Sequence, residues 1–105
     1  MSMKTRAEYI DLLQTFAPEL QARFGITSMR MFGSVARNEH QANSDIDLFV
    51  SMPPVFYKYI EASQFLEDVL GCGVDLIQDH KNIRPFFRQQ IEQDGIDVFQ
   101  TTSSN

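Results

Sequence analysis

Cysteine is nearly absent from this sequence, and long apolar runs are missing. Cys72 is the single cysteine among 105 residues, so an intramolecular disulfide is excluded, and no Cys/His spacing predicts a zinc site. No stretch approaches the roughly 18 apolar residues that a membrane-spanning helix needs, and no apolar signal segment follows the first residues. We therefore expect a cytoplasmic protein that does not associate with membranes.

Basic residues are also scarce. Nine Lys and Arg stand against fourteen Asp and Glu, which gives a formal net charge of −5. A protein that grips phosphate backbones carries a basic stripe, whereas these nine residues are scattered along the chain. Direct nucleic-acid binding is therefore not expected. A small nucleotide stays open as a ligand, because a metal ion can offset its charge.

The amino-acid composition is typical of a single folded domain. Apolar residues make up 43% of the chain and charged residues 22%, proportions typical of globular and not of disordered proteins. Nine Phe and three Tyr supply bulky material for a core. We expect a single domain over residues 1–100, followed by a flexible polar tail at residues 101–105.

Helical and extended patterns alternate along the chain. Thr5 and Glu8 form a capping-box pair before an apolar face with helical spacing, and Pro18 then requires a kink or a second short helix. Strands are expected at 26–32, 45–50, 74–77 and 96–99. Two further helices are expected at 56–70 and 83–93. Phe86 and Phe87, in the second of these helices, are expected in the core. This order predicts an α/β (α+β) fold, in which helices pack on a small mixed sheet of three to four strands.

Three aspartates interrupt strands that are otherwise apolar. Asp45 and Asp47 are two residues apart and point to the same face of their strand, and Asp75 lies within another strand. Aspartate is a poor strand former, so these positions need a reason. If the two strands are neighbours, the carboxylates converge, and two bare charges about 5 Å apart repel by roughly 3 kcal/mol at an effective dielectric constant of 20. A divalent cation bound between the carboxylates turns this net repulsion into net attraction. Two Mg²⁺ ions held by shared carboxylates would stabilise an in-line displacement at phosphorus.

A glycine–serine pair follows the expected strand that ends at Phe32. Gly33 lets the backbone approach a ligand closely, and Ser34 stands at an expected helix start, where N–H groups and a hydroxyl can bind a phosphate. Arg37 lies three residues further on and can reach the same phosphates or the aspartate cleft. The sequence therefore predicts a phosphate-binding turn, a metal site and a positively charged side chain, that of Arg37, within one short unit.

These residues resemble the signature of the nucleotidyltransferases, the superfamily that includes DNA polymerase beta and the aminoglycoside nucleotidyltransferases. The signature is a Gly-Ser pair, an Asp-x-Asp about ten residues later and an aspartate in a later strand. It is matched by Gly33-Ser34, by Asp45-Ile46-Asp47 and by Asp75. The short chain is similar to the minimal nucleotidyltransferases of the MNT type. Asn38 departs from the family's usual glycine, and asparagine tolerates left-handed backbone well.

The resemblance implies a fold and a set of site residues. It implies the nucleotidyltransferase fold, with Asp45 and Asp47 as ligands of both Mg²⁺ ions. Asp75 would complete the second metal site and act as the base toward the incoming hydroxyl. The triphosphate of ATP would be held by Gly33 and Ser34, with Arg37 beside them.

The resemblance also implies a partner. MNT-type proteins are similar to the antitoxin partners of HEPN toxins, which are helical ribonucleases, and the implied reaction transfers AMP from ATP to a tyrosine hydroxyl of the toxin. The short sequence leaves no room for the second domain that usually binds the acceptor, so we expect an acceptor protein that brings its own surface. The apolar run from Met52 to Tyr57 is a candidate docking patch for this protein.

Two other functions fit the same residues. The protein could neutralise its partner by binding alone, although a pure binder need not keep three aspartates. It could instead nucleotidylate a small-molecule hydroxyl, for which a homo-oligomer would have to build the acceptor pocket. The antitoxin interpretation favours a hetero-oligomer with the toxin.

Overall fold

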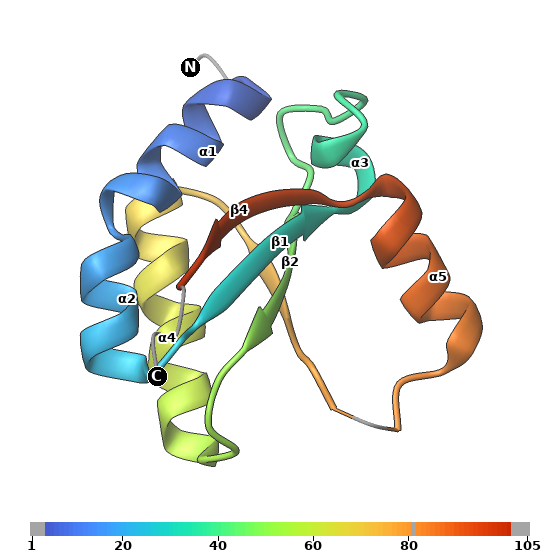
Figure 1. Cartoon of the computed structure of the whole chain (residues 1–105). Helices are drawn as coiled ribbons and strands as arrows, with labels where there is room; N and C mark the ends of the chain where they lie inside the picture. The colour runs from blue at the N-terminus through green and yellow to red at the C-terminus, as the bar shows by residue number, and fades with distance from the viewer. Residues whose placement is uncertain (1–3, 81, 102–105) are drawn as a thin grey trace.

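The computed structural model describes residues 4–80 and 82–101 and is built around a four-stranded sheet (Figure 1). The strands are β1 (Ser28–Phe32), β2 (Ile46–Ser51), β3 (Val74–Gln78) and β4 (Ile96–Gln100). Their spatial order is β3-β2-β1-β4, with β1 antiparallel to β2 and β4, and β2 parallel to β3. The predicted mixed sheet with helices packed on it is confirmed.

Five helices connect or precede the strands: α1 (Arg6–Thr15), α2 (Ala17–Phe24), α3 (Gly33–Ala36), α4 (Phe56–Leu70) and α5 (Pro85–Asp94). The predicted capping box forms, because the Glu8 amide donates to Thr5 Oγ1 at 3.1 Å and the Thr5 amide donates to Glu8 Oε1 at 2.8 Å. Pro18 lies in the first turn of α2, which is a separate helix. Local sequence signals therefore determine where these two helices begin.

The hydrophobic core lies on one face of the sheet. Alternate residues of β2 are buried, so Ile46, Leu48 and Val50 point to α1, α2 and α4, whereas Asp47 and Phe49 point to the other face. Helix α5 lies on that other side of the sheet, apart from the remaining long helices (Figure 1). The sheet therefore has one fully covered face and one face that α5 covers only in part.

Some predicted boundaries are wrong by one or two residues. Ile26 does not belong to β1: Gly25 caps the end of α2 with φ +72°, and the Ile26 amide donates back to the Leu20 carbonyl at 3.3 Å. Ile26 is nevertheless fully buried, which explains its apolar character. Other changes are small: β2 begins at Ile46, β3 ends at Gln78, α5 spans 85–94, and β4 ends at Gln100.

The expected burial of Phe86 is also wrong. Phe86 is 72% exposed, and Phe87 is half-buried with its ring edge-on to Phe32 at a centroid distance of 5.7 Å. Helix α5 packs on the sheet through one side only, so Phe86 points to solvent.

The expected tail lies outside the described residues, apart from Thr101, whose amide donates to the Thr27 carbonyl at 2.8 Å. Over the part of the chain that the structure describes, each helix is too short or too polar to span a lipid bilayer.

Candidate active site

The parallel pairing of β2 and β3 places two of the predicted aspartates side by side. Asp47 and Asp75 are direct partners in the register of the two strands. Both point away from the core, because the residues next to them, Leu48 and Leu76, are buried on the opposite face. The carboxyl groups are close enough for the charge of Asp75 to raise the pKa of Asp47. The structure thus brings Asp47 and Asp75 together on the partly open face of the sheet.

Asp45 lies next to this pair at the start of β2. The Ile46 amide donates to the Gly73 carbonyl at 3.0 Å, which places Asp45 beside the residue that precedes β3. A Cβ atom at Gly73 would lie only 2.3 Å from Asp45 Oδ1. Gly73 therefore provides the space for this carboxylate. The sequence alone does not indicate this role of Gly73, because it depends on the pairing of β2 with β3.

Partial burial and the neighbouring carboxylates raise the pKa of Asp47. Partial burial, and then the negative charges of Asp75 and Asp45, raise the pKa of Asp47 to about 6. The positive charge of Arg37 opposes this increase. An ionised Asp47 is therefore unfavourable here unless a cation compensates its charge.

Within residues 4–80 and 82–101, no group of three or more His, Cys, Asp and Glu side chains is arranged to hold a metal ion. The structure shows a close pair, Asp47 and Asp75, with Asp45 next to it. The charge accumulated at Asp47 and the oxygen donors nevertheless fit Mg²⁺, which binds through one or two carboxylates together with substrate phosphates. The three-ligand, two-ion site stays a prediction.

Gly33 lies against the same carboxylates. Phe32 pairs with Asp47 across β1 and β2, and Gly33 follows with φ +78° as the first residue of α3. A Cβ atom at Gly33 would lie 2.0 Å from Asp47 Oδ2. Only glycine fits here, because another residue would suffer both the left-handed backbone and this clash. The one-turn helix α3, which also contains Ser34, is thereby placed beside the aspartates.

The connection after α3 follows the prediction for Asn38. Asn38 is the one described non-glycine residue with positive φ, at +61°. Its amide donates to the Val35 carbonyl at 3.0 Å, so the left-handed residue ends the turn. The substitution of the family's usual glycine by asparagine is therefore accommodated by the backbone, as predicted.

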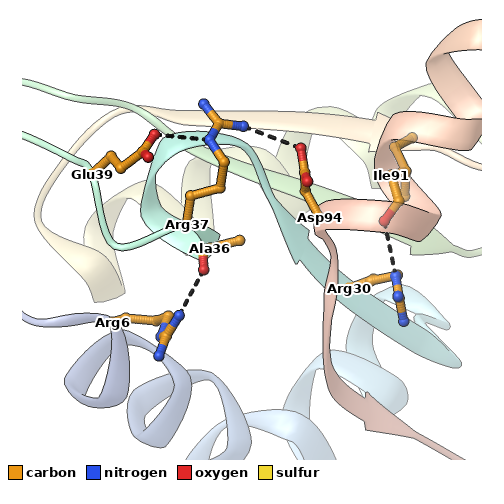
Figure 2. Close-up of polar contacts among 7 residues, drawn as sticks. All are labelled: Arg6, Arg30, Ala36, Arg37, Glu39, Ile91 and Asp94. Atoms are coloured by element: carbon orange, nitrogen blue, oxygen red, sulfur yellow. Dashed lines mark hydrogen bonds and ion pairs between the residues drawn. The ribbon is translucent and has the colours of Figure 1, made fainter.

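Arg37 is held near the site by two ion pairs (Figure 2). Its Nε donates to Glu39 Oε1 at 3.0 Å and its Nη1 donates to Asp94 Oδ2 at 3.3 Å. The guanidinium remains close enough to lower the pKa of Asp47. Asp94 is a contact that the sequence could not predict, because it is 57 residues away and lies at the end of α5.

A second arginine, Arg6, binds the end of α3. Arg6 Nη1, on the first residue of α1, donates to the Ala36 carbonyl at 2.7 Å (Figure 2). This bond satisfies a carbonyl at the end of the one-turn helix, where no further turn follows. Arg6 is not among the residues predicted from sequence, because an arginine at a helix start is usually solvated.

Comparison with known proteins identifies the family. The family model for the nucleotidyltransferase domain matches residues 13–98. A relative from Methanocaldococcus jannaschii, named "putative protein adenylyltransferase", is 37% identical over 98 residues, covering 91% of this chain and 100% of that protein. The solved structure of a "putative minimal nucleotidyltransferase" is 30% identical and has a TM-score of 0.74, covering 91% of this chain and 98% of that one.

The fold also occurs in a toxin–antitoxin complex. This solved structure contains a tri-AMPylated Shewanella oneidensis HEPN toxin with its MNT antitoxin, and the chain matches it with a TM-score of 0.62 and 21% identity. The match covers 88% of this chain and 73% of that one, and at this identity it shows the fold. The family model and the two closer proteins span nearly the whole chain, including every aspartate of the site. The chain therefore belongs to the nucleotidyltransferase domain family and is a nucleotidyltransferase.

Proposed function

We propose that this nucleotidyltransferase is the antitoxin of a HEPN-type ribonuclease toxin in the cytoplasm and transfers AMP from ATP to a tyrosine hydroxyl of that toxin. The observation that carries the proposal is the pairing of Asp47 with Asp75 directly beside Gly33. The name of the Methanocaldococcus jannaschii relative and the AMPylated toxin in the Shewanella oneidensis complex support a protein as the acceptor.

The transfer is a displacement at the α-phosphorus of ATP. The tyrosine oxygen forms a bond to this phosphorus, the bond from the phosphorus to the bridging oxygen of the β-phosphate breaks, and pyrophosphate leaves. The hydroxyl proton goes to the carboxylate of Asp75, which is exposed on the partly open sheet face. Asp75 is thus the general base of the proposed reaction.

The remaining residues bind and orient ATP. The backbone N–H of Gly33 and the hydroxyl of Ser34 donate to the triphosphate, and Arg37 adds a positive charge next to it. Asp45 and Asp47, together with Asp75, would hold Mg²⁺. When bound, the metal ion offsets the negative charge of the carboxylates and of the phosphates.

The apolar run from Met52 to Tyr57 supports a protein partner in part. Phe56 is 77% exposed and Tyr57 is 62% exposed, whereas Met52 is partly buried and packs against the core. Two large aromatic side chains in solvent suit the centre of an interface. The docking role of this patch stays a prediction.

A transfer assay tests the proposal. Purified protein, Mg²⁺ and ATP labelled on the α-phosphate are mixed with the helical protein encoded by the neighbouring reading frame. We expect labelled toxin, with the label on tyrosine. Asp47→Asn should abolish labelling, whereas Asp68→Asn, which removes an exposed carboxylate of α4, should not change it. Absence of label with the unmodified protein would contradict the proposal.

Rescue of cells that express the toxin separates catalysis from binding alone. If transfer neutralises the toxin, the double variant Asp45→Asn/Asp47→Asn fails to protect the cells although it still binds the toxin. Protection equal to that of the unmodified protein would show neutralisation by occlusion. Modification of a small hydroxyl substrate without any protein partner would instead show a small-molecule enzyme.

A further inference from the structure

A cavity of about 570 Å³ lies between β3 and the start of α5. Its apolar lining consists of Ile77, Ile83, Phe86 and Phe87, with His80 and Arg84 among its polar residues. None of these residues has a role in the site described above. The volume lies within the range of pockets that bind small organic groups.

The cavity is on the same sheet face as the aspartate pair. Ile77 follows Asp75 by two residues along β3, and the residue between them, Leu76, is buried in the core. Side chains two residues apart in a strand point to the same face. The floor of the cavity is therefore only about 6.6 Å along the strand from Asp75.

The strand registers place the phosphate-binding turn and Ile77, on the floor of the cavity, on opposite sides of Asp47, while Phe87 on the other wall of the cavity packs on Phe32. Strand β2 lies between β1, which leads into Gly33, and β3, which carries Ile77. In an in-line displacement, the attacking and leaving groups lie on opposite sides of the phosphorus. If pyrophosphate leaves on the Gly33 side, the attacking hydroxyl arrives from the β3 side, where the cavity lies.

The lining suits a planar aromatic group. Phe86 and Phe87 offer two rings, and aromatic groups pack on such rings in edge-on or offset arrangements. A phenol ring that lies on Ile77 is long enough to present its hydroxyl near Asp75, because two strand residues span only about 6.6 Å. The exposure of Phe86, at 72%, leaves this ring free to contact an incoming side chain.

We propose that the cavity between β3 and α5 binds the aromatic side chain of the acceptor and directs its hydroxyl to Asp75. This inference rests on the proposed function and adds the place where the acceptor enters. It also gives the exposed ring of Phe86 a role in acceptor binding.

Binding of N-acetyltyrosinamide to the ¹⁵N-labelled full chain tests the inference. The titration is followed by NMR with a non-hydrolysable ATP analogue and Mg²⁺ already bound. We expect saturable shifts at the amides of Ile77 and Phe86, and Phe86→Ala should weaken the binding at least fivefold. Ile60→Ala is the control, because it removes another exposed apolar side chain, which belongs neither to this cavity nor to the docking patch. Both side chains are exposed, so we expect both variants to unfold thermally as the unmodified protein does.

Two results would overturn the inference. The first is an absence of saturable shifts at Ile77 and Phe86. The second is that the ATP analogue itself shifts these amides and excludes the tyrosine probe, which would assign the cavity to the nucleobase. The NMR titration measures binding of the tyrosine probe and does not depend on AMP transfer to the toxin. Labelled toxin without probe binding would reject the cavity assignment alone, whereas probe binding without labelled toxin would reject the proposed reaction.

Discussion

Two glycines decide whether the carboxylates of the site fit into the fold. A Cβ atom would lie 2.0 Å from Asp47 Oδ2 at Gly33 and 2.3 Å from Asp45 Oδ1 at Gly73. Gly71 also has a positive φ, +73° against +78° at Gly33, but the nearest atom to its Cβ position is Lys4 Nζ at 3.8 Å. The chain therefore offers a comparison of two glycines with similar positive φ, of which only Gly33 lies against a carboxylate.

Gly33→Ala should reduce nucleotidyl transfer by more than about 100-fold, because displacement of a catalytic carboxylate by about 1 Å is enough for such a loss. Gly71→Ala should lower the free energy of unfolding by about 1 kcal/mol through the left-handed backbone and leave the transfer rate within about twofold. Transfer kinetics and urea unfolding of both variants check the comparison. Equal loss of activity in the two variants would show that backbone strain, and not contact with Asp47, matters.

The pKa of Asp47 makes stability depend on pH. Its folded-state pKa is raised to about 6 from 3.8, mainly by burial and by the charges of Asp75 and Asp45. The folded protein therefore binds the proton more tightly than the unfolded chain, and stability falls as the pH rises from about 4 to about 6. Asp47→Asn removes this loss and should stabilise the metal-free protein at pH 8 by about 2 kcal/mol more than at pH 4.

Urea unfolding of Asp47→Asn at both pH values, in the presence of a chelator, measures this difference. Asp68→Asn is the control, because its exposed carboxylate lies on α4, away from the aspartate pair. A stabilisation of Asp47→Asn that is the same at pH 4 and pH 8 would contradict the raised pKa of Asp47.

The site residues differ in how far the sequence could predict them. The spacing of Gly33-Ser34 and Asp45-Ile46-Asp47, with Asp75 in a later strand, is local and chemically specific, so these residues can be singled out from the amino-acid sequence alone, and their roles stay a prediction. The proximity of Asp47 and Asp75 required one assumption, that their strands are neighbours, which the parallel pairing of β2 and β3 supports. Asp94 and Gly73 could not be predicted, because their roles arise only from contacts between distant segments.

At the scale of elements, Arg30 of β1 attaches the last turn of α5 to the sheet. Arg30 Nε donates to the Ile91 carbonyl at 3.1 Å (Figure 2), and Nη2 donates to the Glu92 carbonyl at 3.0 Å. Its Nη1 also pairs with Asp97 of β4 at 2.5 Å. A guanidinium at the last turn of a helix satisfies free carbonyls and opposes the negative end of the helix dipole. Helix α5 thus depends on a side chain of the strand that leads into Gly33.

Arg30→Met should lower the free energy of unfolding by about 2 kcal/mol, because two carbonyls lose charged donors. Asp97→Asn removes only the ion pair with an exposed carboxylate and should cost less than about 0.5 kcal/mol. Urea unfolding measures both values. Hydrogen exchange should become faster in α5 for Arg30→Met, and unchanged exchange there would contradict this attachment.

The secondary structure is easier to predict than the placement of α5. Residues 56–70 carry an apolar helical period and end before Gly71, and α4 has these bounds. The burial of Ile91 also agrees with an apolar side on α5. The sequence could not show that α5 would lie on the other face of the sheet, because that position depends on the tertiary contacts of Arg30, Phe32 and Arg37. This explains why the apolar pattern of α5 wrongly predicts a core position for Phe86.

At the scale of the whole molecule, charge opposes the binding of ATP. The chain carries a formal net charge of −5, Asp47 and Asp75 lie side by side on one sheet face, and Asp45 is close enough for its charge to act on Asp47. A triphosphate that approaches this face meets like charges, whose repulsion amounts to several kcal/mol over short distances. The nine basic residues are dispersed, and Arg37 is already paired with Glu39 and Asp94. We therefore expect nucleotide binding to depend on a divalent cation.

Thermal unfolding with a non-hydrolysable ATP analogue tests this dependence. With Mg²⁺ and the analogue at about 100 times its dissociation constant, the native state gains about 2.7 kcal/mol, and Tm should rise by at least several degrees in a chain of this size. A chelator should remove the rise, because the carboxylates and the phosphates then repel each other, and Asp47→Asn should reduce it. Asp68→Asn should show the full rise. A rise of Tm that persists in the chelator would mean that the nucleotide binds away from the aspartates, since only a site that combines phosphates with these carboxylates requires the cation.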